Sequence, residues 1–429
     1  MSHVASSIDR PAWIGTLPED WTGDWLKWSV SLKTERATAE EQERLPYLSN
    51  ENVESWTGRL LGDALEPVEA DSRRFVAGDV LFNKLRPYLA KVFHAEFEGA
   101  SSGELLCLRA SNRVLPRYLF YVLTSRGFID AVDAETFGSK MPRADWETVG
   151  HQPLPLPPHD TQRRIARFLD EKTARIDALI AKKRALLERL AEKRQALITQ
   201  AVTKGLDPAV RLKDSGMGWL GKIPEHWEVK SLRYIATIGN GSTPQRDDPD
   251  YWEDGSYPWL NSAVVNLASV SEASDWVTAC ALKECHLPRI EPPAVLIGIT
   301  GQGRTRGMAS LLVFEATINQ HLAYIKPFRA VADAAYIRHV MSVAYTFLRN
   351  ESDGGGSTKG AITCEQLAHV RVPVPHHDEQ LAIAAHVDAA CTQFDRLVAG
   401  VRTSLDRLTE YRAALITAAV TGQLPALNG

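Results

Sequence analysis

The sequence predicts an α+β protein in which two mixed α/β domains alternate with two long helices that pair in a coiled coil. Three observations predict this fold class. One large module occurs twice, each module ends in a polar stretch with apolar residues every seven positions, and each preceding segment has short apolar runs between turn residues. With 429 residues, the chain is long enough for two or more domains with cores of their own.

The repeat is clearest at the ends of the module. RQALITQAVTKGL (194–206) and RAALITAAVTGQL (412–424) lie 218 residues apart and agree at nine of 13 positions. LPLPPHDTQ (154–162) matches VPVPHHDEQ (372–380) at the same offset, and WIGTLPEDW (13–21) matches WLGKIPEHW (219–227) at an offset of 206. A solenoid would repeat every ~20–50 residues, and here only the frame of a large module is kept. We therefore expect the frame to set placement and the diverged interior to set what each copy recognises.

The repeat and the composition shifts predict seven segments. They are an N-terminal arm (1–11), a first domain (12–158), a first long helix (159–206), a linker (207–217), a second domain (218–376), a second long helix (377–424) and a tail (425–429).

Both long helices carry heptad spacing, which predicts a seam between them. The seam residues are Leu169, Ile176, Leu190, Leu197, Val387, Phe394, Val401, Leu408 and Leu415. Each helix spans about 44 residues, or roughly 65 Å at about 1.5 Å per residue. Asp160 and Asp378 follow the prolines, where helix N-caps are expected. Matched seams in one chain favour an intramolecular pair, because its effective concentration is high. The alternative is a coiled coil between two chains, made by each helix separately.

The first long helix is also basic. It has twelve Lys/Arg against six Asp/Glu, whereas the second has four against six. Such an excess is usually a solvated face, and the alternative is that it holds phosphates or an acidic partner.

The two middle segments, 22–153 and 228–371, read as compact mixed domains. Runs such as AGDVLFNKLRPYLAKVFHAEF and PAVLIGITGQGRTRGMASLLVF alternate with Gly, Pro, Asn and Asp turn signals, which predicts many short strands. Short helices are expected at 116–130 and 334–349.

Loops in both middles carry basic and hydrogen-bonding residues beside glycine and aromatics. Such side chains hold phosphates and read base edges, and glycine lets backbone approach closely. The candidate DNA-binding residues are Asn83, Lys84, Arg86, Tyr88, Ser139, Lys140 and Arg143 in the first middle, and Ser242, Thr243, Gln245, Arg246, Gln302, Arg304, Thr305, Arg306, Ser357, Thr358 and Lys359 in the second. Any one of these loops alone is more often an ordinary surface turn, but a Gly-Ser loop recurs at the same place in both copies.

Motifs for chemistry are missing. The chain has no P-loop, GQGRTRG (301–307) is not a dinucleotide fingerprint, and no Ser/His/Asp or Cys/His set has a supporting motif. Glu291-Pro292-Pro293-Ala294 lacks the leading Asn/Asp and the closing aromatic of adenine methyltransferases. Cys280, Cys285 and His286 lack a second ligand pair at metal spacing. We expect no catalytic residues and no metal site.

Composition bounds the partners and the compartment. A net charge of −4 and a pI of about 6.3 exclude a histone-like basic coat but allow a local basic groove. The start lacks the apolar core of a signal peptide, and no apolar run is long enough to span a bilayer. Five cysteines, an odd and sparse set, fit a reducing compartment, so a cytoplasmic protein is expected.

Several linked motifs together resemble one family. WLGKIPEHWEVKSLRYIA, the PLPP-x-x-x-Q segment, the heptad helix and the ALIT-x-AVTG ending are similar to the specificity (S) subunits of type I restriction–modification systems, over about residues 12–424. The second copy departs from the pattern at PHHDEQ, where His376 stands in place of a second proline.

This resemblance implies a function. Each middle would be a target recognition domain reading one half of a split, asymmetric DNA target, and the helices would pack antiparallel as a ruler between them around a pseudo-twofold axis. One chain would engage double-stranded DNA and two methyltransferase subunits, and through them the restriction subunits. S-adenosylmethionine, ATP and Mg would be used by those partners, with no cofactor bound by this chain. The alternatives are a coiled-coil scaffold whose middles bind protein and an enzyme with an unrecognised motif.

Overall fold

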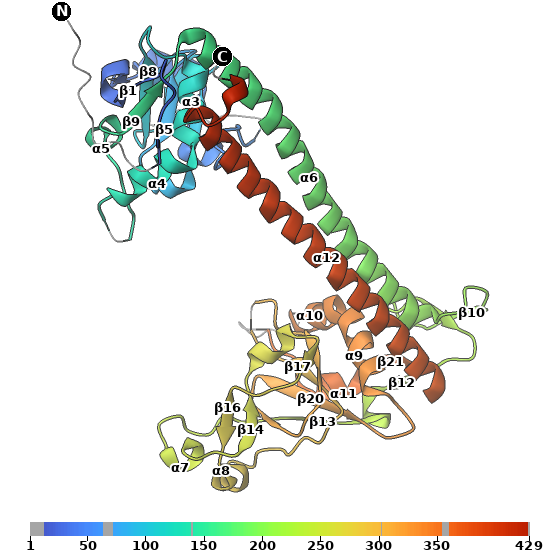
Figure 1. The fold of residues 1–429 in the computed structure, drawn as a ribbon. Coiled ribbons are helices and arrows are strands. Elements are labelled where there is room, and N and C mark those ends of the chain that lie inside the picture. Colours follow the sequence, from blue (N-terminus) through green and yellow to red (C-terminus); the bar gives the residue numbers. More distant parts are fainter. Residues whose placement is uncertain (1–12, 63–71, 139, 302, 354–359, 428–429) are drawn as a thin grey trace, which may run out of the picture. The chain divides into compact units, whose positions relative to one another are not determined.

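The computed structural model describes residues 13–62, 72–138, 140–301, 303–353 and 360–427. The chain divides into two compact units, residues 1–185 with 401–429 and residues 186–400. This division falls inside both long helices, α6 (His159–Lys204) and α12 (His377–Val420). Each unit therefore contains one mixed domain and one stretch of each long helix (Figure 1), and the predicted α+β class is confirmed.

The first mixed domain lies before α6 in the chain. Its main sheet has the order β2-β8-β5-β6, a smaller sheet has the order β3-β7-β4, and β1 pairs antiparallel with β9. The strands are β1 (Thr22–Trp25), β2 (Val30–Lys33), β3 (Tyr47–Leu48), β4 (Arg73–Phe75), β5 (Val80–Asn83), β6 (Val92–His94), β7 (Gly99–Ser101), β8 (Leu105–Ala110) and β9 (Pro153–Leu156).

The second mixed domain lies between α6 and α12 in the chain. Its main sheet has the order β13-β20-β17-β18-β15, a smaller sheet has the order β16-β14-β19, and two-stranded pairs join β12 to β21 and β10 to β11. The strands are β10 (Leu212–Asp214), β11 (Lys222–Pro224), β12 (Glu228–Ser231), β13 (Ala236–Asn240), β14 (Tyr257–Leu260), β15 (Ser269–Val270), β16 (Asp275–Val277), β17 (Ala294–Gly298), β18 (Ala309–Leu312), β19 (Thr317–Ile318), β20 (Leu322–Pro327) and β21 (Arg371–Val374).

Short helices complete both domains. They are α1 (Leu26–Ser29), α2 (Ala39–Arg44), α3 (Pro116–Thr124), α4 (Arg126–Ala134), α5 (Trp146–Gly150), α7 (Pro249–Trp252), α8 (Ala279–Glu284), α9 (Ala334–Val343), α10 (Tyr345–Asp353) and α11 (Cys364–His369). The helices expected at 116–130 and 334–349 are each split in two. Ser125 breaks the first by taking an extended backbone, at φ −66° and ψ 144°.

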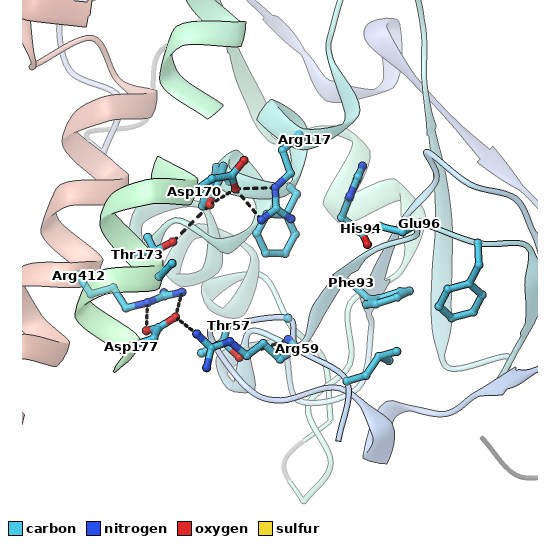
Figure 2. Close-up of a pocket in the computed structure, with 16 residues that line it drawn as sticks. Thr57, Arg59, Phe93, His94, Glu96, Arg117, Asp170, Thr173, Asp177 and Arg412 are labelled. Atoms are coloured by element: carbon cyan, nitrogen blue, oxygen red, sulfur yellow. Dashed lines mark hydrogen bonds and ion pairs between the residues drawn. The ribbon is translucent and has the colours of Figure 1, made fainter. Parts of the chain in front are cut away.

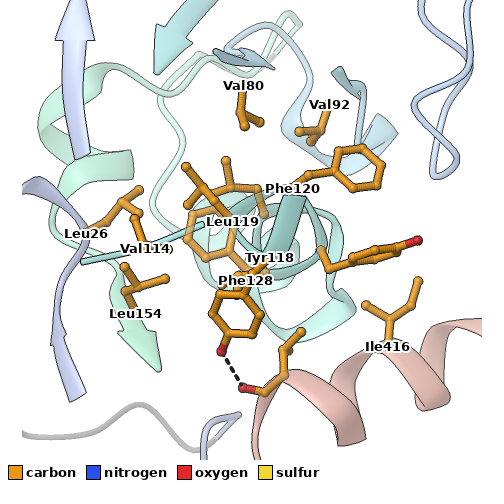
Figure 3. Packing of buried hydrophobic residues seen from close by; sticks show 14 of the residues in the cluster. Leu26, Val80, Val92, Val114, Tyr118, Leu119, Phe120, Phe128, Leu154 and Ile416 are labelled. Atoms are coloured by element: carbon orange, nitrogen blue, oxygen red, sulfur yellow. Dashed lines mark hydrogen bonds between the residues drawn. The ribbon is translucent and has the colours of Figure 1, made fainter. Parts of the chain in front are cut away.

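The central strands are buried on both faces, because successive side chains of a strand point to opposite sides. On β5, Val80 and Phe82 join the core that also holds α3 and the long helices, while Leu81 joins a second core under the smaller sheet. On β17, Val295 and Leu296 divide in the same way. Figure 3 shows the first of these cores gathered around Tyr118 and Leu119 of α3.

Hydrogen bonds repeat the symmetry of the sequence at an offset of 218 residues. The buried hydroxyl of Tyr118 donates to Pro155 O at 3.0 Å and to Val420 O at 3.3 Å. That of Tyr336 donates to Pro373 O at 3.2 Å and to Val202 O at 3.5 Å. Each domain is therefore tied to the end of the long helix that belongs to the other copy.

The glutamine of the PLPP-x-x-x-Q segment joins the start of each long helix to its domain. Gln162 Oε1 accepts from Leu115 N at 2.7 Å, and its Nε2 donates to Arg113 O and Pro157 O at 3.0 and 2.9 Å. Gln380 makes the equivalent three bonds at 2.9, 3.0 and 2.9 Å. Both side chains are fully buried.

Gln162→Ala is expected to lower the free energy of unfolding by about 2 kcal/mol, because it removes three hydrogen bonds of a fully buried side chain and leaves the buried Pro157 carbonyl without that partner. Chemical denaturation measures the loss. The exposed Gln195, which reaches only Thr199 at 3.4 Å, is the control, and its alanine variant should stay within about 0.5 kcal/mol. Equal effects of the two substitutions would contradict the role given to Gln162.

The long helices begin at residues 159 and 377, as the predicted segments do, and end before residues 206 and 424. They end at Lys204 and Val420 because Gly205 and Gly422 take the left-handed backbone, both at φ 75°. The prediction that Asp160 and Asp378 are N-caps is wrong, since the helices start one residue earlier and both carboxylates lie in the first turn. There they still face the positive end of the helix dipole.

Contacts within each unit establish that the two helices pair antiparallel. In the first unit, Leu169 and Ile176 near the start of α6 share a core with Leu415 near the end of α12. In the second unit, Ile198 near the end of α6 shares a core with Val387 near the start of α12. All nine predicted seam residues are buried or half-buried.

Candidate nucleic-acid interface

The loops singled out in the sequence lie at matching places in the two domains. In the first, residues 84–91 connect the antiparallel strands β5 and β6, and in the second, residues 299–308 connect β17 and β18. A second loop joins each connection through the backbone. Leu85 bridges Arg143, Thr300 bridges Ala361, and Arg86 N donates to Pro142 O at 2.7 Å. In the first domain the two predicted loops are thus joined, and in the second the bridge is made by Ala361, since the predicted residues 354–359 lie outside the described residues.

The first domain presents cations and aromatics on its pair of loops. Arg86, Tyr88 and Lys140 are exposed, and Lys84 is half-buried. Asn83 is buried instead, and its side chain bonds Leu85 O at 2.7 Å and Leu85 N at 3.3 Å, so it shapes the start of the loop.

Two charged neighbours set the electrostatics of these loops. Arg143 Nη2 donates to both carboxylate oxygens of Glu104 at 3.0 Å. The pKa of the Lys84 ammonium lies below its ordinary value, mainly because the group is partly buried. Glu104 opposes this shift, and the positive charges of Arg143 and Arg73 add to it. Glu104 therefore lies inside a cluster of cations and partly compensates their charge.

The connection 299–308 in the second domain displays one arginine and buries another. Arg304 is exposed, and its carbonyl accepts from the Tyr345 hydroxyl at 3.0 Å. Arg306 has only 3% of its side chain exposed, and it donates to Asp353 at 2.6 Å. A Cβ at Gly360 would collide with the Arg306 guanidinium, so this close approach requires glycine. In this arrangement Arg306 holds the loop in place.

The loop 241–246 is clamped by two tryptophans. Trp252 Nε1 donates to Gln245 O at 2.9 Å, and Trp259 Nε1 donates to Ser242 O at 3.1 Å. The Arg246 guanidinium lies 4.1 and 4.7 Å from the centres of the two rings, close enough for cation–π attraction. Gln245 and Arg246 are exposed.

Two residues that sequence reasoning missed connect these loops. The Thr243 hydroxyl bonds the Gln320 amide, Gln320 Nε2 lies 3.4 Å from His321 Nε2, and His321 Nδ1 lies 2.7 Å from Thr300 Oγ1. Gln320 and His321 lie in the turn before β20, far in sequence from both loops, so no local motif pointed to them.

Several predicted residues lie outside the described residues. They are Ser139, Gln302, Ser357, Thr358 and Lys359. Thr305 is described and half-buried.

The two arginines of the 299–308 connection are expected to behave differently. Arg304→Ala should weaken DNA binding without changing unfolding. If Arg304 reads a guanine, the loss should be about 1–3 kcal/mol at one base pair, and if it holds a phosphate, the loss should be similar for all sequences. Arg306→Ala should also lower the melting temperature, because it removes a buried guanidinium. Titration of the assembled complex with DNA, paired with thermal unfolding, separates the two; unchanged binding for Arg304→Ala would remove that residue from the interface.

In the first unit, the domain meets both long helices at a polar junction (Figure 2). Asp177 of α6 accepts from Arg412 of α12 at 2.8 Å and from Arg59 of the domain at 2.8 Å. Arg412 also donates to Trp56 O at 2.9 Å. Asp177 and Arg412 are both buried, and with Asp170 they line a cavity of about 600 Å³.

The second unit contains the same interhelix pair at an offset of 218 residues. Arg194 of α6 donates to Asp395 of α12 at 2.7 Å, with 35% and 61% of the two side chains exposed. The arginine that begins both RxALIT repeats thus pairs with the other helix in each unit.

A second pair of equivalent carboxylates holds a domain helix in each unit. Asp170 accepts from the Tyr121 hydroxyl at 2.6 Å, and Asp388 lies 2.8 Å from Nε2 of the buried His339. Burial and the bond to Asp170 raise the pKa of Tyr121 to about 12. Burial lowers the pKa of His339, and the bond to Asp388 opposes that shift.

Acidification is expected to destabilise the second unit through His339. Its pKa is lower in the folded chain than its ordinary value of 6.5, so the unfolded chain binds the proton more readily. The stabilisation is therefore complete above about pH 6.5 and is lost as pH falls through the folded pKa. His339→Tyr copies Tyr121 and keeps a donor for Asp388. Unfolding followed between pH 7 and pH 5 should show a smaller loss in this variant, and an unchanged pH slope would exclude His339 as the cause.

Two features of the described residues bear on other functions. None of their groups of three or more His, Cys, Asp or Glu could hold a metal ion. Within the same ranges, no helix is both long and apolar enough to cross a membrane.

Comparison with known proteins decides the family. The family described as "Type I restriction modification DNA specificity domain" matches residues 40–189 and 224–403, which is most of the chain and covers both copies of the module. The chain belongs to this family of specificity subunits. The family is non-catalytic, in agreement with the absence of catalytic motifs from the sequence.

Relatives match over nearly the full length of this specificity subunit. The MjaVIII type I restriction enzyme specificity subunit of Methanocaldococcus jannaschii is 22% identical over 96% of this chain and 95% of its own. The HsdS subunit from Thermoanaerobacter tengcongensis has the same fold, with a TM-score of 0.56, 19% identity, and 95% and 98% of the two chains covered. A chain from a structural study of type I restriction–modification complex assembly and conformational transition has a TM-score of 0.76, 20% identity, and 95% and 100% coverage.

Proposed function

We propose that each mixed domain of this specificity subunit reads one half of a bipartite, asymmetric DNA target. The observation that carries the proposal is a repeated frame with different loops. The same hairpin connection, bridged through the backbone by Arg143 in one domain and Ala361 in the other, recurs in both domains, but it contains Lys84, Arg86 and Tyr88 in one and Arg304 and Thr305 in the other. Equal placement with unequal side chains favours two different half-sites.

The proposed boundaries of the recognition domains are residues 12–158 and 218–376. The helices 159–206 and 377–424 would set the gap between the half-sites and dock two methyltransferase subunits, one for each copy of the frame, with restriction subunits joining through the complex. Support comes from the interhelix pairs Asp177–Arg412 and Asp395–Arg194, which repeat in both units. S-adenosylmethionine, ATP and Mg would be used by the partners, and this chain would bind no cofactor.

Duplicating one domain tests the proposal. In this variant, residues 219–376 are replaced by residues 13–158, so that both frames carry the same loops; the matching ends WIGTLPEDW and WLGKIPEHW define the junction. Co-expressed with the methyltransferase subunit, it is expected to direct methylation to an inverted repeat of one half-site. A motif that stays asymmetric would contradict independent reading by each domain. If neither this variant nor the natural chain binds DNA or directs its methylation, a scaffold that binds protein partners would be favoured.

A further inference from the structure

The turn before β8 in the first domain and the turn before β20 in the second occupy equivalent places. β8 lies next to β5 in its sheet, and β20 lies next to β17. In the first domain, Ser102 N donates to Leu48 O at 3.0 Å and Lys84 N donates to Glu104 O at 3.0 Å. In the second, Asn319 N donates to Leu260 O at 3.0 Å and Ile299 N donates to His321 O at 2.9 Å. Glu104 and His321 are therefore equivalent positions, each beside the first residue of a candidate DNA-binding loop.

The Glu104 side chain ties the two loops of the first domain together. Its carboxylate accepts two bonds from Arg143 at 3.0 Å, and its backbone carbonyl accepts from Lys84 N. A carboxylate opposes the approach of phosphates. Its place beside Lys84 and Arg143 therefore indicates that it fixes the geometry of these cations rather than adding to binding.

At the equivalent turn, the second domain joins a different pair of loops through a chain of side chains. One consistent set of donors runs from the Thr243 hydroxyl to Gln320 Oε1, from Gln320 Nε2 to His321 Nε2, and from His321 Nδ1–H to Thr300 Oγ1. Gln320 and His321 are exposed, yet their polar groups turn toward neighbouring loops. The chain joins the loop 241–246 to the connection 299–308.

We propose that Glu104 and the Gln320–His321 pair are positioning residues that determine how strictly each domain discriminates its half-site. The inference rests on the proposed function. Pairs this exposed contribute little to stability, with 32% of the Glu104 side chain and 42% of the Arg143 side chain accessible. Their effect is on loop geometry, because the hydrogen bonds that read base edges depend on where each loop places its side chains.

The test compares two variants in the complete complex. The natural chain, Glu104→Ala and His321→Ala are each co-expressed with the methyltransferase subunit in a methylation-free host, and the methylated fraction is mapped at the target and at every single-base variant of it. Glu104→Ala is expected to raise methylation of wrong sites by about tenfold relative to the target in one half only, and His321→Ala in the other half only. Glu104→Gln, which keeps an oxygen for Arg143, should lie between natural and alanine forms.

Asp130→Ala is the matched control, since Asp130 is an exposed carboxylate whose partner, Arg126, lies with it on α4 and not in either loop. It should change nothing. Thermal unfolding of all forms should agree, which separates positioning from loss of fold. The inference would be overturned if methylation of wrong sites, relative to the target, stayed within twofold of the natural chain for both Glu104→Ala and His321→Ala. It would also be overturned if both variants lost discrimination in the same half of the target. A natural chain that yields no split motif would instead defeat the proposed function itself.

Discussion

Asp177→Ala is expected to lower the free energy of unfolding of the first unit by about 3–5 kcal/mol, because it leaves a buried charge without its partner. Only 10% of the Arg412 side chain is exposed, and with Asp177 gone its described partner is the Trp56 carbonyl. Arg59 is half-exposed, so it can turn to water at little cost. Denaturant unfolding of the purified chain measures the change.

The repeat supplies the matched control for this substitution. Asp395→Ala removes the equivalent carboxylate in the second unit, where 61% of that side chain is exposed, and it should cost at most about 1 kcal/mol. Similar losses for the two variants would show that burial of the first pair does not matter. The difference would establish that the same interhelix contact has different energetic weight in the two copies.

Lengthening both long helices by one heptad is expected to move the half-sites apart by up to about 3 base pairs. Seven residues add about 10.5 Å of helix, and each base pair advances about 3.4 Å. The insertions belong after Ala185 and after Gly400, where the chain passes from one unit to the other, with apolar residues at the seam positions. A heptad preserves the seam, because the apolar residues repeat every seven.

The gap between the half-sites is measured by mapping the adenines that are methylated when the lengthened chain is present. Methylation at the natural motif should disappear and reappear at a motif with the same halves and a longer gap. A heptad inserted into α6 alone mismatches the pair and should abolish methylation. Methylation with an unchanged gap would contradict the helices as the ruler.

The repeated ends of the module and the long helices could be predicted from the sequence, because they depend on local patterns that occur twice. Heptad spacing picked out residues from Leu169 to Leu415 that are buried or half-buried, and the matching Gln162 and Gln380 make equivalent bonds in both copies. The interior was harder, since its contacts join residues far apart in sequence. Arginine is a common phosphate ligand, but Arg306 is buried and pairs with Asp353. Glu104 and His321 belong to no sequence motif, and their roles depend on partners distant in sequence.

Loop placement explains these differences in physical terms. Whether an arginine faces water or a carboxylate depends on which loop the fold brings to it, as with Gly360 beside Arg306 and Glu104 beside Arg143. Hydrophobic periodicity indicates secondary structure but does not show which residues become neighbours in the folded chain. Residues for phosphate and base contact could therefore be proposed by type, but their supporting partners required the structure.

A map of methylated adenines shows whether this chain directs modification to a split DNA target. The natural chain is expressed with the methyltransferase subunit proposed as its partner in a methylation-free host, and modified bases are located by single-molecule sequencing. We predict one split, asymmetric motif with a gap of fixed length. A soluble complex that adds no methylation, or that methylates a continuous motif, would contradict the reading of two half-sites by the two domains.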